Sequence, residues 1–155
     1  MSGREGFTLV ETIVSITIFC FVFSAVLFLQ SSGFAFYVKV NNKVEVEENL
    51  RIALARMSRN IREANRVRSV ADNPPKIEIT PQDGKNVYGY RYDSTGREIE
   101  ENIRGTYLPI ASHVTFLEFE YAQADRTVSI KIRGEKGNSG VIEMSTKVFL
   151  RVISQ

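Results

Sequence analysis

The sequence predicts an α+β protein in which one long amino-terminal helix packs on a mostly antiparallel β-sheet. An apolar run from Phe7 to Leu29 is long enough to cross a bilayer as a helix. Apolar residues then recur at helical spacing, and the segment after Pro75 alternates apolar with polar residues, the pattern of strands that bury one face. In a chain of 155 residues, this leaves room for one small domain beyond the membrane segment.

The composition excludes several kinds of site. Cys20 is the one cysteine and His113 the one histidine, which excludes an intramolecular disulfide, a Cys/His zinc site and a Cys-His nucleophile pair. We therefore expect no cofactor and no small-molecule substrate. The formal net charge of +2 is too small to indicate nucleic-acid binding by itself.

The membrane segment contains one acidic residue, Glu11, about one turn from its start. A charged side chain inside an apolar span costs roughly 2.5 to 3.5 kcal/mol on insertion scales, and a charge kept there is by default functional. Complementing the helix dipole would return only about 0.3 to 1 kcal/mol. Glu11 is therefore expected to do more than start a helix.

The residues Gly6 to Glu11 read Gly-Phe-Thr-Leu-Val-Glu, follow a short polar leader and open the apolar run. They resemble the processing site of type IV prepilins and prepseudopilins. The resemblance implies that a prepilin peptidase cuts after Gly6 and methylates the new amino terminus at Phe7. It also implies a pilin-like fold, a subunit-assembly role for Glu11, and contacts with other pilins, membrane lipid and an inner-membrane assembly platform. We expect a single pass through the cytoplasmic membrane, with the amino terminus inside and the domain exported to the periplasm or the cell exterior.

An ordinary signal peptide is the competing interpretation, because the small residues Gly33 and Ala35 precede Phe36. However, the apolar run exceeds the roughly 7 to 15 residues usual in a signal peptide, where a carboxylate such as Glu11 is also unusual. The prepilin interpretation is therefore preferred.

The first helix is expected to continue past the membrane to about Val67, a length on the order of 90 Å. The expected organisation is a leader over residues 1–6, a membrane half over 7–36 and an exported domain over 37–155, with helix to about residue 70. One apolar stripe marks the helix face that should cover the sheet, and its central residues are Leu50, Leu54, Met57 and Ile61.

Arginines occupy many of the other positions of this half-helix. We interpret them as a solvated face with local pairs, such as Glu47 with Arg51 and Arg59 with Glu63. A contact with acidic neighbours, lipid headgroups or DNA is the alternative.

The β region is expected over residues 76–153. Residues 98–104 form a poor strand, expected at an edge or as a loop, and residues 105–109 form a connection. Five segments alternate well enough to be strands, and these are residues 76–80, 86–93, 114–121, 127–133 and 141–152.

Two features of the β region have a structural interpretation that we prefer. The three tyrosines Tyr88, Tyr90 and Tyr92 share one strand face and are expected to pack on the core. Glu135 and Asn138 could supply oxygen ligands, but their loop has too few carboxylates for a calcium site.

Residues 47–51, 57–64 and 110–121 look like the corresponding parts of the larger minor pseudopilins and minor pilins, notably the kind lettered J. This resemblance implies a structural subunit, not an enzyme, that joins the initiating or tip complex of a type IV pilus or a type II secretion pseudopilus. One alternative is a pseudopilin of a DNA-uptake system. Another is a membrane-anchored enzyme or binding domain whose motif is accidental, which would require a pocket with convergent polar groups in the β region.

Overall fold

A computed structural model of the chain describes residues 8–70, 75–81 and 87–150. Its first element is helix α1, Leu9–Arg62, which ends before the predicted limit at Val67. The prediction of helix to residues 67–70 is wrong, because Ala64–Val70 forms strand β1 and pairs antiparallel with β2, Lys76–Pro81. Backbone pairing with a strand that follows later in the chain outweighs the apolar spacing that suggested a helix.

The chain divides into two compact units, Met1–Val38 and Lys39–Gln155. In the first unit, α1 carries exposed apolar side chains on all sides. Its amino-terminal part reaches a mean hydropathy of 2.6 and is 0% buried, which by length and composition suits a membrane span.

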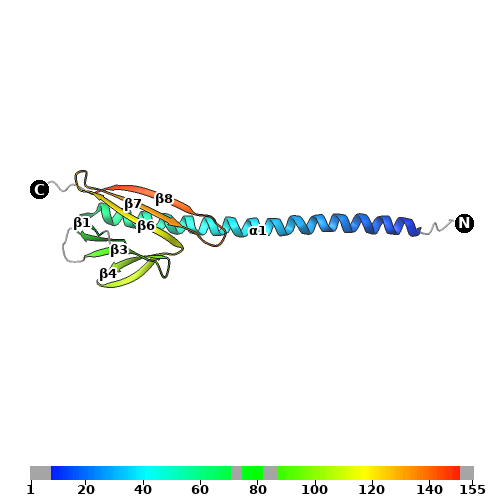
Figure 1. The fold of residues 1–155 in the computed structure, drawn as a ribbon, viewed down its shortest axis with the longest axis horizontal. Helices are drawn as coiled ribbons and strands as arrows, with labels where there is room; N and C mark the ends of the chain where they lie inside the picture. Colours follow the sequence, from blue (N-terminus) through cyan, green and yellow to red (C-terminus); the bar gives the residue numbers. More distant parts are fainter. Residues whose placement is uncertain (1–7, 71–74, 82–86, 151–155) are drawn as a thin grey trace. The chain divides into compact units, whose positions relative to one another are not determined.

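The second unit contains two antiparallel sheets beside the end of α1 (Figure 1), where the sequence predicted one sheet. A five-stranded sheet has the order β1-β2-β3-β4-β5, and a three-stranded sheet has the order β6-β7-β8. The remaining strands are β3 (Tyr88–Asp93), β4 (Glu98–Ile103), β5 (Thr106–Ala111), β6 (Val114–Ala122), β7 (Thr127–Gly134) and β8 (Ile142–Phe149).

Strands β4 and β5 differ from the sequence prediction. The segment expected at an edge or as a loop is β4, which lies between β3 and β5, and the expected connection forms most of the edge strand β5. The two strands join through Arg104 (φ 53°) and Gly105 (φ 89°), a pair of left-handed residues that matches the twist of a hairpin. Pro109 lies in β5, where an edge position tolerates the missing N–H.

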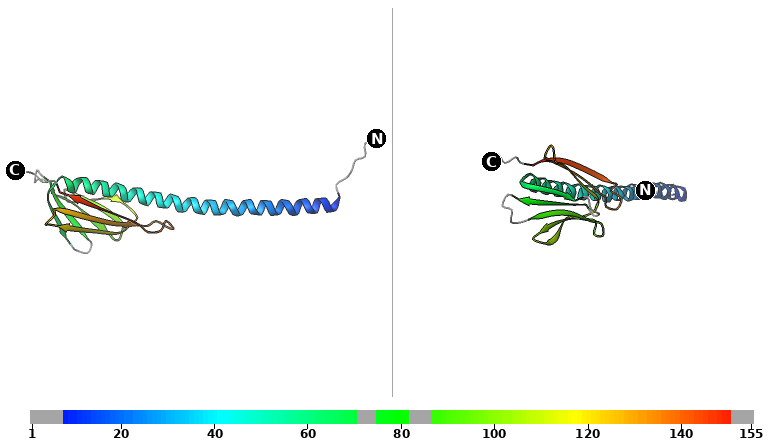
Figure 2. Two further views of the ribbon diagram at one scale, coloured as in Figure 1. Left: turned by 90° about the horizontal axis from the view of Figure 1, so that it is seen from above. Right: turned by 60° about the vertical axis from the view of Figure 1, so that its left-hand side comes forward.

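One apolar core joins α1 to both sheets. Figure 2 (left) shows the strands along one side of the carboxy-terminal part of α1. Gly134 of β7 permits a close approach, because a Cβ there would lie 2.8 Å from Cγ1 of Val46 and 2.9 Å from the carbonyl oxygen of His113. Leu54 of the predicted stripe is half-buried at the margin of the core. The fully buried residues of the helix are Val46, Leu50, Ala53, Met57 and Ile61.

Candidate functional site

The predicted processing site, Gly6 and Phe7, lies outside the described residues, which begin at Thr8. Cleavage after Gly6 and methylation of Phe7 therefore stay predictions. What the structure describes is the start of the helix that follows this site.

Thr8 and Glu11 form a capping box at the start of α1. The backbone N–H of Glu11 donates to the Thr8 hydroxyl, while the backbone N–H and the hydroxyl of Thr8 both donate to Oε2 of Glu11, each at 3.3 Å. A threonine followed three residues later by a glutamate is the sequence signature of this arrangement. The sequence therefore contains the signature of a local role for Glu11 beside the predicted role in pairing between subunits.

The capping box changes the expected state of Glu11 in a single subunit. Its carboxylate accepts local hydrogen bonds and lies near the helix amino terminus, where the dipole favours a negative charge. Both Thr8 and Glu11 follow the predicted cut, so removal of the leader would retain both residues. Glu11 is also exposed, which leaves it accessible to a second donor. Its pairing with another subunit stays a prediction.

Several hydroxyl groups in the first unit donate to backbone carbonyls of their own helix. Ser15 and Thr17 each donate to the carbonyl four residues earlier at 2.8 Å, and Ser24 does so at 2.7 Å. In an apolar medium, such bonds remove the cost of an unpaired donor. These hydroxyls therefore need no partner on another helix.

A buried polar cluster links α1 to the five-stranded sheet. Glu101 of β4 is 4% exposed, and its carboxylate accepts from Arg56 at 2.5 Å, from the Tyr90 hydroxyl at 2.8 Å and from Asn60 at 3.2 Å. Burial and the hydrogen bond to Glu101 raise the pKa of Tyr90 well above its usual range. The sequence pattern did not predict this cluster. Its one local signal is that Glu101 follows the buried Ile99 by two residues, which places its side chain on the inward strand face.

A second polar contact connects α1 with the loop after β7. Glu45 of α1 pairs with Lys136 and lies 3.5 Å from Nε2 of His113, so His113 has a partner that the sequence spacing did not reveal. The hydrogen bond from Lys136 lowers the pKa of Glu45. In the same loop, Asn138 accepts a hydrogen bond from Asn42 of α1 at 3.4 Å.

Other predicted features have mixed outcomes. Tyr90 is buried and its neighbours Tyr88 and Tyr92 pack partly buried against the core, as predicted. The predicted ion pair of Glu47 with Arg51 forms at 3.1 Å, whereas the predicted pair of Arg59 with Glu63 is not among the ion pairs of the described residues. Within residues 8–70, 75–81 and 87–150, no group of three His, Cys, Asp or Glu side chains is placed to hold a metal ion.

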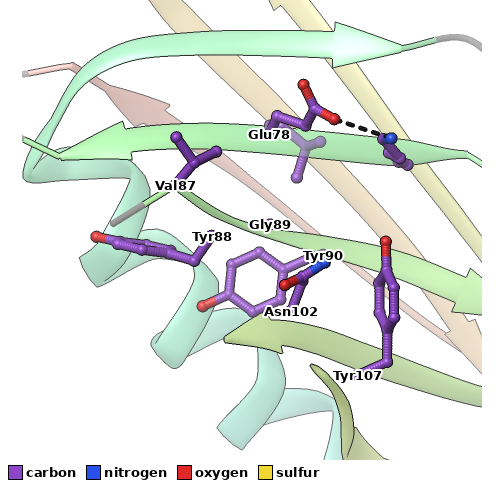
Figure 3. Close-up of a pocket in the computed structure, with 9 residues that line it drawn as sticks. Glu78, Val87, Tyr88, Gly89, Tyr90, Asn102 and Tyr107 are labelled. Atoms are coloured by element: carbon purple, nitrogen blue, oxygen red, sulfur yellow. Dashed lines mark ion pairs between the residues drawn. The ribbon is translucent and has the colours of Figure 1, made fainter. Parts of the chain in front are cut away.

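A small pocket lies on the five-stranded sheet beside Gly89 of β3 (Figure 3). Its walls include Glu78, Asn102 and Tyr107, and Glu78 pairs with Lys76 at 2.8 Å. The cavity volume is about 50 Å³, whereas small-molecule sites typically have roughly 300 to 1,000 Å³. Polar groups converge on this pocket, but its volume is below that of a typical small-molecule site.

Residues 1–27 match the family described as the prokaryotic N-terminal methylation motif. The match spans the predicted processing site and the first part of α1. It supports the type IV pilin and pseudopilin superfamily, and implies a prepilin peptidase and other pilins as partners. Together with the exposed apolar helix, it supports a single-pass membrane-anchored subunit.

A segment of 66 residues is 41% identical to the D subunit of V-type ATP synthase from Thermoanaerobacter sp. (strain X514) and from Thermoanaerobacter pseudethanolicus. This similarity covers 41% of the chain, and the matched segment spans 30% of the length of these relatives. A match over so small a part of both proteins does not show that this chain shares an activity or a partner with these relatives. No solved structure is significantly similar to the chain.

Proposed function

We propose that the protein is a structural minor pilin or pseudopilin, of the J-like kind, that joins the initiating or tip complex of a type IV pilus or a type II secretion pseudopilus. The observation that carries the proposal is the methylation motif at residues 1–27, which continues into an exposed apolar helix. The order of helix and antiparallel sheets is in keeping with a filament subunit. In this proposal the protein is a scaffold and has no catalytic residues.

Processing by the prepilin peptidase prepares the subunit for assembly. The enzyme hydrolyses the peptide bond between Gly6 and Phe7 and methylates the Phe7 amine, which stays cationic after one methylation. The apolar part of α1 then holds the subunit in the membrane, with residues 37–155 exported, until the assembly platform moves the subunit into the filament.

Assembly brings the Phe7 amine of one subunit to the Glu11 carboxylate of its neighbour. In the single subunit, Glu11 has Thr8 as its local donor, and this donor is neutral. The neighbour's amine adds a full opposite charge in a medium of low dielectric constant, where an ion pair is strong. Losing one partner of a buried ion pair typically costs about 3 to 5 kcal/mol, so this contact would set the register of the subunits as well as their affinity.

The intact mass of the mature protein from membranes tests the processing step. The expected mass lacks residues 1–6 and includes one methyl group. Gly6→Val should leave the precursor uncut because of its bulk, whereas Gly6→Ala should be processed in part. A mature chain that starts at Phe36 would instead support a signal peptide.

Identification of co-purifying proteins tests the assembly role. Mature protein captured from membranes and from sheared filaments should carry other pilins, which mass spectrometry would identify. Recovery of soluble partners alone would contradict the proposal.

DNA uptake is a second candidate function, favoured by one observation. Exposed arginines gather at the end of α1 and in β1, at positions 59, 62, 66 and 68. Clustered arginines bind phosphates in a salt-dependent manner. Duplex DNA should then bind the full-length protein at low salt, more weakly after Arg62→Glu and Arg66→Glu. Equal binding by this variant would contradict the DNA function.

A further inference from the structure

Within the residues that the structure describes, the two sheets have four edge strands, and β8 differs from the other three. The edge strands are β1 and β5 of the five-stranded sheet and β6 and β8 of the three-stranded sheet. β1, β5 and β6 each contain an extra residue where the pairing register shifts, and these residues are Asn65, Ile110 and Thr115. β8 pairs with β7 along its whole length without a shift.

The regular pairing of β8 leaves its free edge open to a further strand. Bulges twist an edge strand and interrupt its row of free backbone groups, and proline removes a donor, so natural sheets use both to prevent unwanted pairing. β5 has Pro109 in addition to its bulge. β8 has neither a proline nor a bulge, and Figure 1 shows it as the outermost strand on its side of the domain.

The register shows which backbone groups of β8 point to the open side. The Leu150 N–H donates to the Arg126 carbonyl at 3.0 Å, and this pair continues the register in which Val148 lies opposite Val128. In an antiparallel ladder, hydrogen-bonded pairs alternate with pairs whose N–H and C=O groups point away from each other. The even-numbered residues of β8 are therefore bonded to β7. The residues whose backbone groups point to the open edge are Glu143, Ser145, Lys147 and Phe149.

The same four residues have exposed side chains on one face of the sheet. Phe149 is 65% exposed, and Val141, which continues the row just before the strand, is 63% exposed. The row therefore presents apolar, acidic, small polar, basic and apolar side chains in this order. Glu143 pairs with two cations of β7, whereas Lys147 makes no ion pair within the described part of the chain. A second strand with complementary side chains can match this row.

We propose that the open edge of β8 binds an extended segment of another protein, which joins the three-stranded sheet as an antiparallel fourth strand. Antiparallel pairing is the more stable kind per residue. It requires an acid opposite Lys147 and a base opposite Glu143, so the segment has an acid, a base four residues later, and an apolar residue two positions beyond each. Main-chain bonds to an added strand provide affinity, and its alternate side chains provide specificity.

A second copy of this chain has a suitable sequence but the wrong direction. In β8 itself, Glu143 precedes Lys147 by four residues, so two β8 strands would be complementary when antiparallel. However, β8 runs along the end of α1 (Figure 1), and antiparallel pairing of two β8 strands would point the two helices in opposite directions. Two chains anchored in one membrane cannot adopt that arrangement. The partner is therefore a different protein, whichever filament the chain joins.

Binding of a synthetic peptide tests the contact. The probe is the labelled peptide Phe-Thr-Glu-Thr-Ser-Thr-Lys-Thr-Val, whose acid lies opposite Lys147 and whose base lies opposite Glu143 in the proposed register. Fluorescence anisotropy follows its binding to the full-length protein in detergent. The matched control exchanges the Glu and the Lys of the peptide, which places like charges opposite each other. The first peptide should bind about tenfold more tightly, since two cross-strand charge pairs change sign.

Methylation of the peptide backbone tests the ladder without a change in the protein. Peptide residues directly opposite Glu143, Ser145 and Lys147 direct their N–H groups toward β8. N-methylation of the Lys, Ser and Glu of the peptide should therefore lower the affinity by at least about tenfold, because three main-chain bonds are lost. N-methylation of the three Thr residues that follow them should leave the affinity unchanged, because those N–H groups point away from β8.

Substitutions in β8 test the same contact from the side of the protein. Lys147→Glu should remove the preference between the two peptides, because each then forms one attractive and one repulsive pair. A peptide with Lys at both charged positions should bind this variant best. Ser145→Pro should abolish binding, since it removes an N–H at the open edge and retains the bonds to β7. Ser145→Thr is the matched control, because it keeps the N–H.

The outcomes decide between an added strand, a second copy and no contact. Equal binding of the two charged peptides, or equal losses for the two methylated forms, would overturn the added strand. Unchanged binding by Ser145→Pro with a wild-type unfolding midpoint would overturn it as well, and if this variant unfolds, the methylated peptides decide. A wild-type chain that is dimeric in detergent and becomes monomeric after Ser145→Pro would overturn the assignment to a different protein.

Discussion

The two halves of α1 present similar side chains in opposite ways. In the first unit Phe21 is 78% exposed and Leu29 is 69% exposed, whereas in the second unit Leu50 and Ile61 are fully buried. The first half is apolar on every side, so no single sheet could cover it, while the second half confines its large apolar residues mainly to one face. The apolar content of a helix therefore predicts burial only when its periodicity is considered as well.

Polar side chains also find their hydrogen-bond partners in different places in the two halves of α1. In the first half, the hydroxyls of Thr17 and Ser24 donate to carbonyls of their own helix. In the second half, Arg56 and Asn60 donate to Glu101 on a strand. A helix in lipid must satisfy its polar groups internally, whereas a helix on a sheet can share them with a strand.

The largest expected effect is a loss of folding stability when a buried apolar residue in the second half of α1 is truncated. Ile61→Ala should lower the free energy of unfolding by about 2 to 5 kcal/mol, because it leaves a cavity between the helix and the sheets. Leu54→Ala should cost less, since Leu54 is half-buried. Denaturant unfolding in detergent gives the values, with Phe21→Ala in the first half as the control expected to cause no change. A similar loss for Ile61→Ala and Phe21→Ala would remove the distinction between the halves.

The next largest expected effect is the loss of stability when the polar cluster around Glu101 is weakened. Glu101→Gln should lower the free energy of unfolding by about 1 to 3 kcal/mol, because it weakens the bonds from Arg56 and Tyr90 at a buried site. The exposed Glu118→Gln on β6 is the matched control. An unchanged denaturation midpoint for Glu101→Gln would show that the cluster does not hold the helix to the sheet.

The next expected effect is weaker assembly with partner pilins when Glu11, in the first half of α1, is replaced. Glu11→Ala should leave cleavage and insertion intact and lower recovery with partner pilins by at least about tenfold, because the neighbour's Phe7 amine loses its charged partner. Glu11→Lys should be worse, since it would place like charges together. Thr8→Val separates the two roles of Glu11, because it removes the hydroxyl of the capping box and retains the carboxylate. Equal recovery of all variants at matched membrane levels would exclude Glu11 as the assembly contact.

The smallest expected effect is the loss of folding stability of the second unit at acid pH. Hydrogen bonds from Arg133 and Lys131 lower the pKa of Glu143, and a hydrogen bond from Lys76 lowers the pKa of Glu78. Because these folded-state pKa values lie below the unfolded ones, the stabilisation is complete above the unfolded pKa and is lost as pH falls through the folded pKa. Thermal midpoints should therefore decline below about pH 4.5. Glu143→Gln should make that decline shallower, and an identical pH profile would contradict the assignment.

The sequence by itself determined the features that depend on neighbouring residues. The membrane segment is a continuous apolar run, the helix face toward the sheets follows from spacing at Leu50, Met57 and Ile61, and most strands follow from alternation. The capping box of Thr8 and Glu11 was also present as a local pattern.

The tertiary structure alone decided features that depend on pairing between separate segments. The helix ends at Arg62 because Ala64–Val70 finds a partner in β2, and β4 is an inner strand because β5 pairs with its open side. Glu101 is tolerated in the core because Arg56 and Asn60, far away in sequence, lie opposite it on α1. Each of these contacts gains its free energy only after folding has brought the segments together, so no pattern within one segment can predict it.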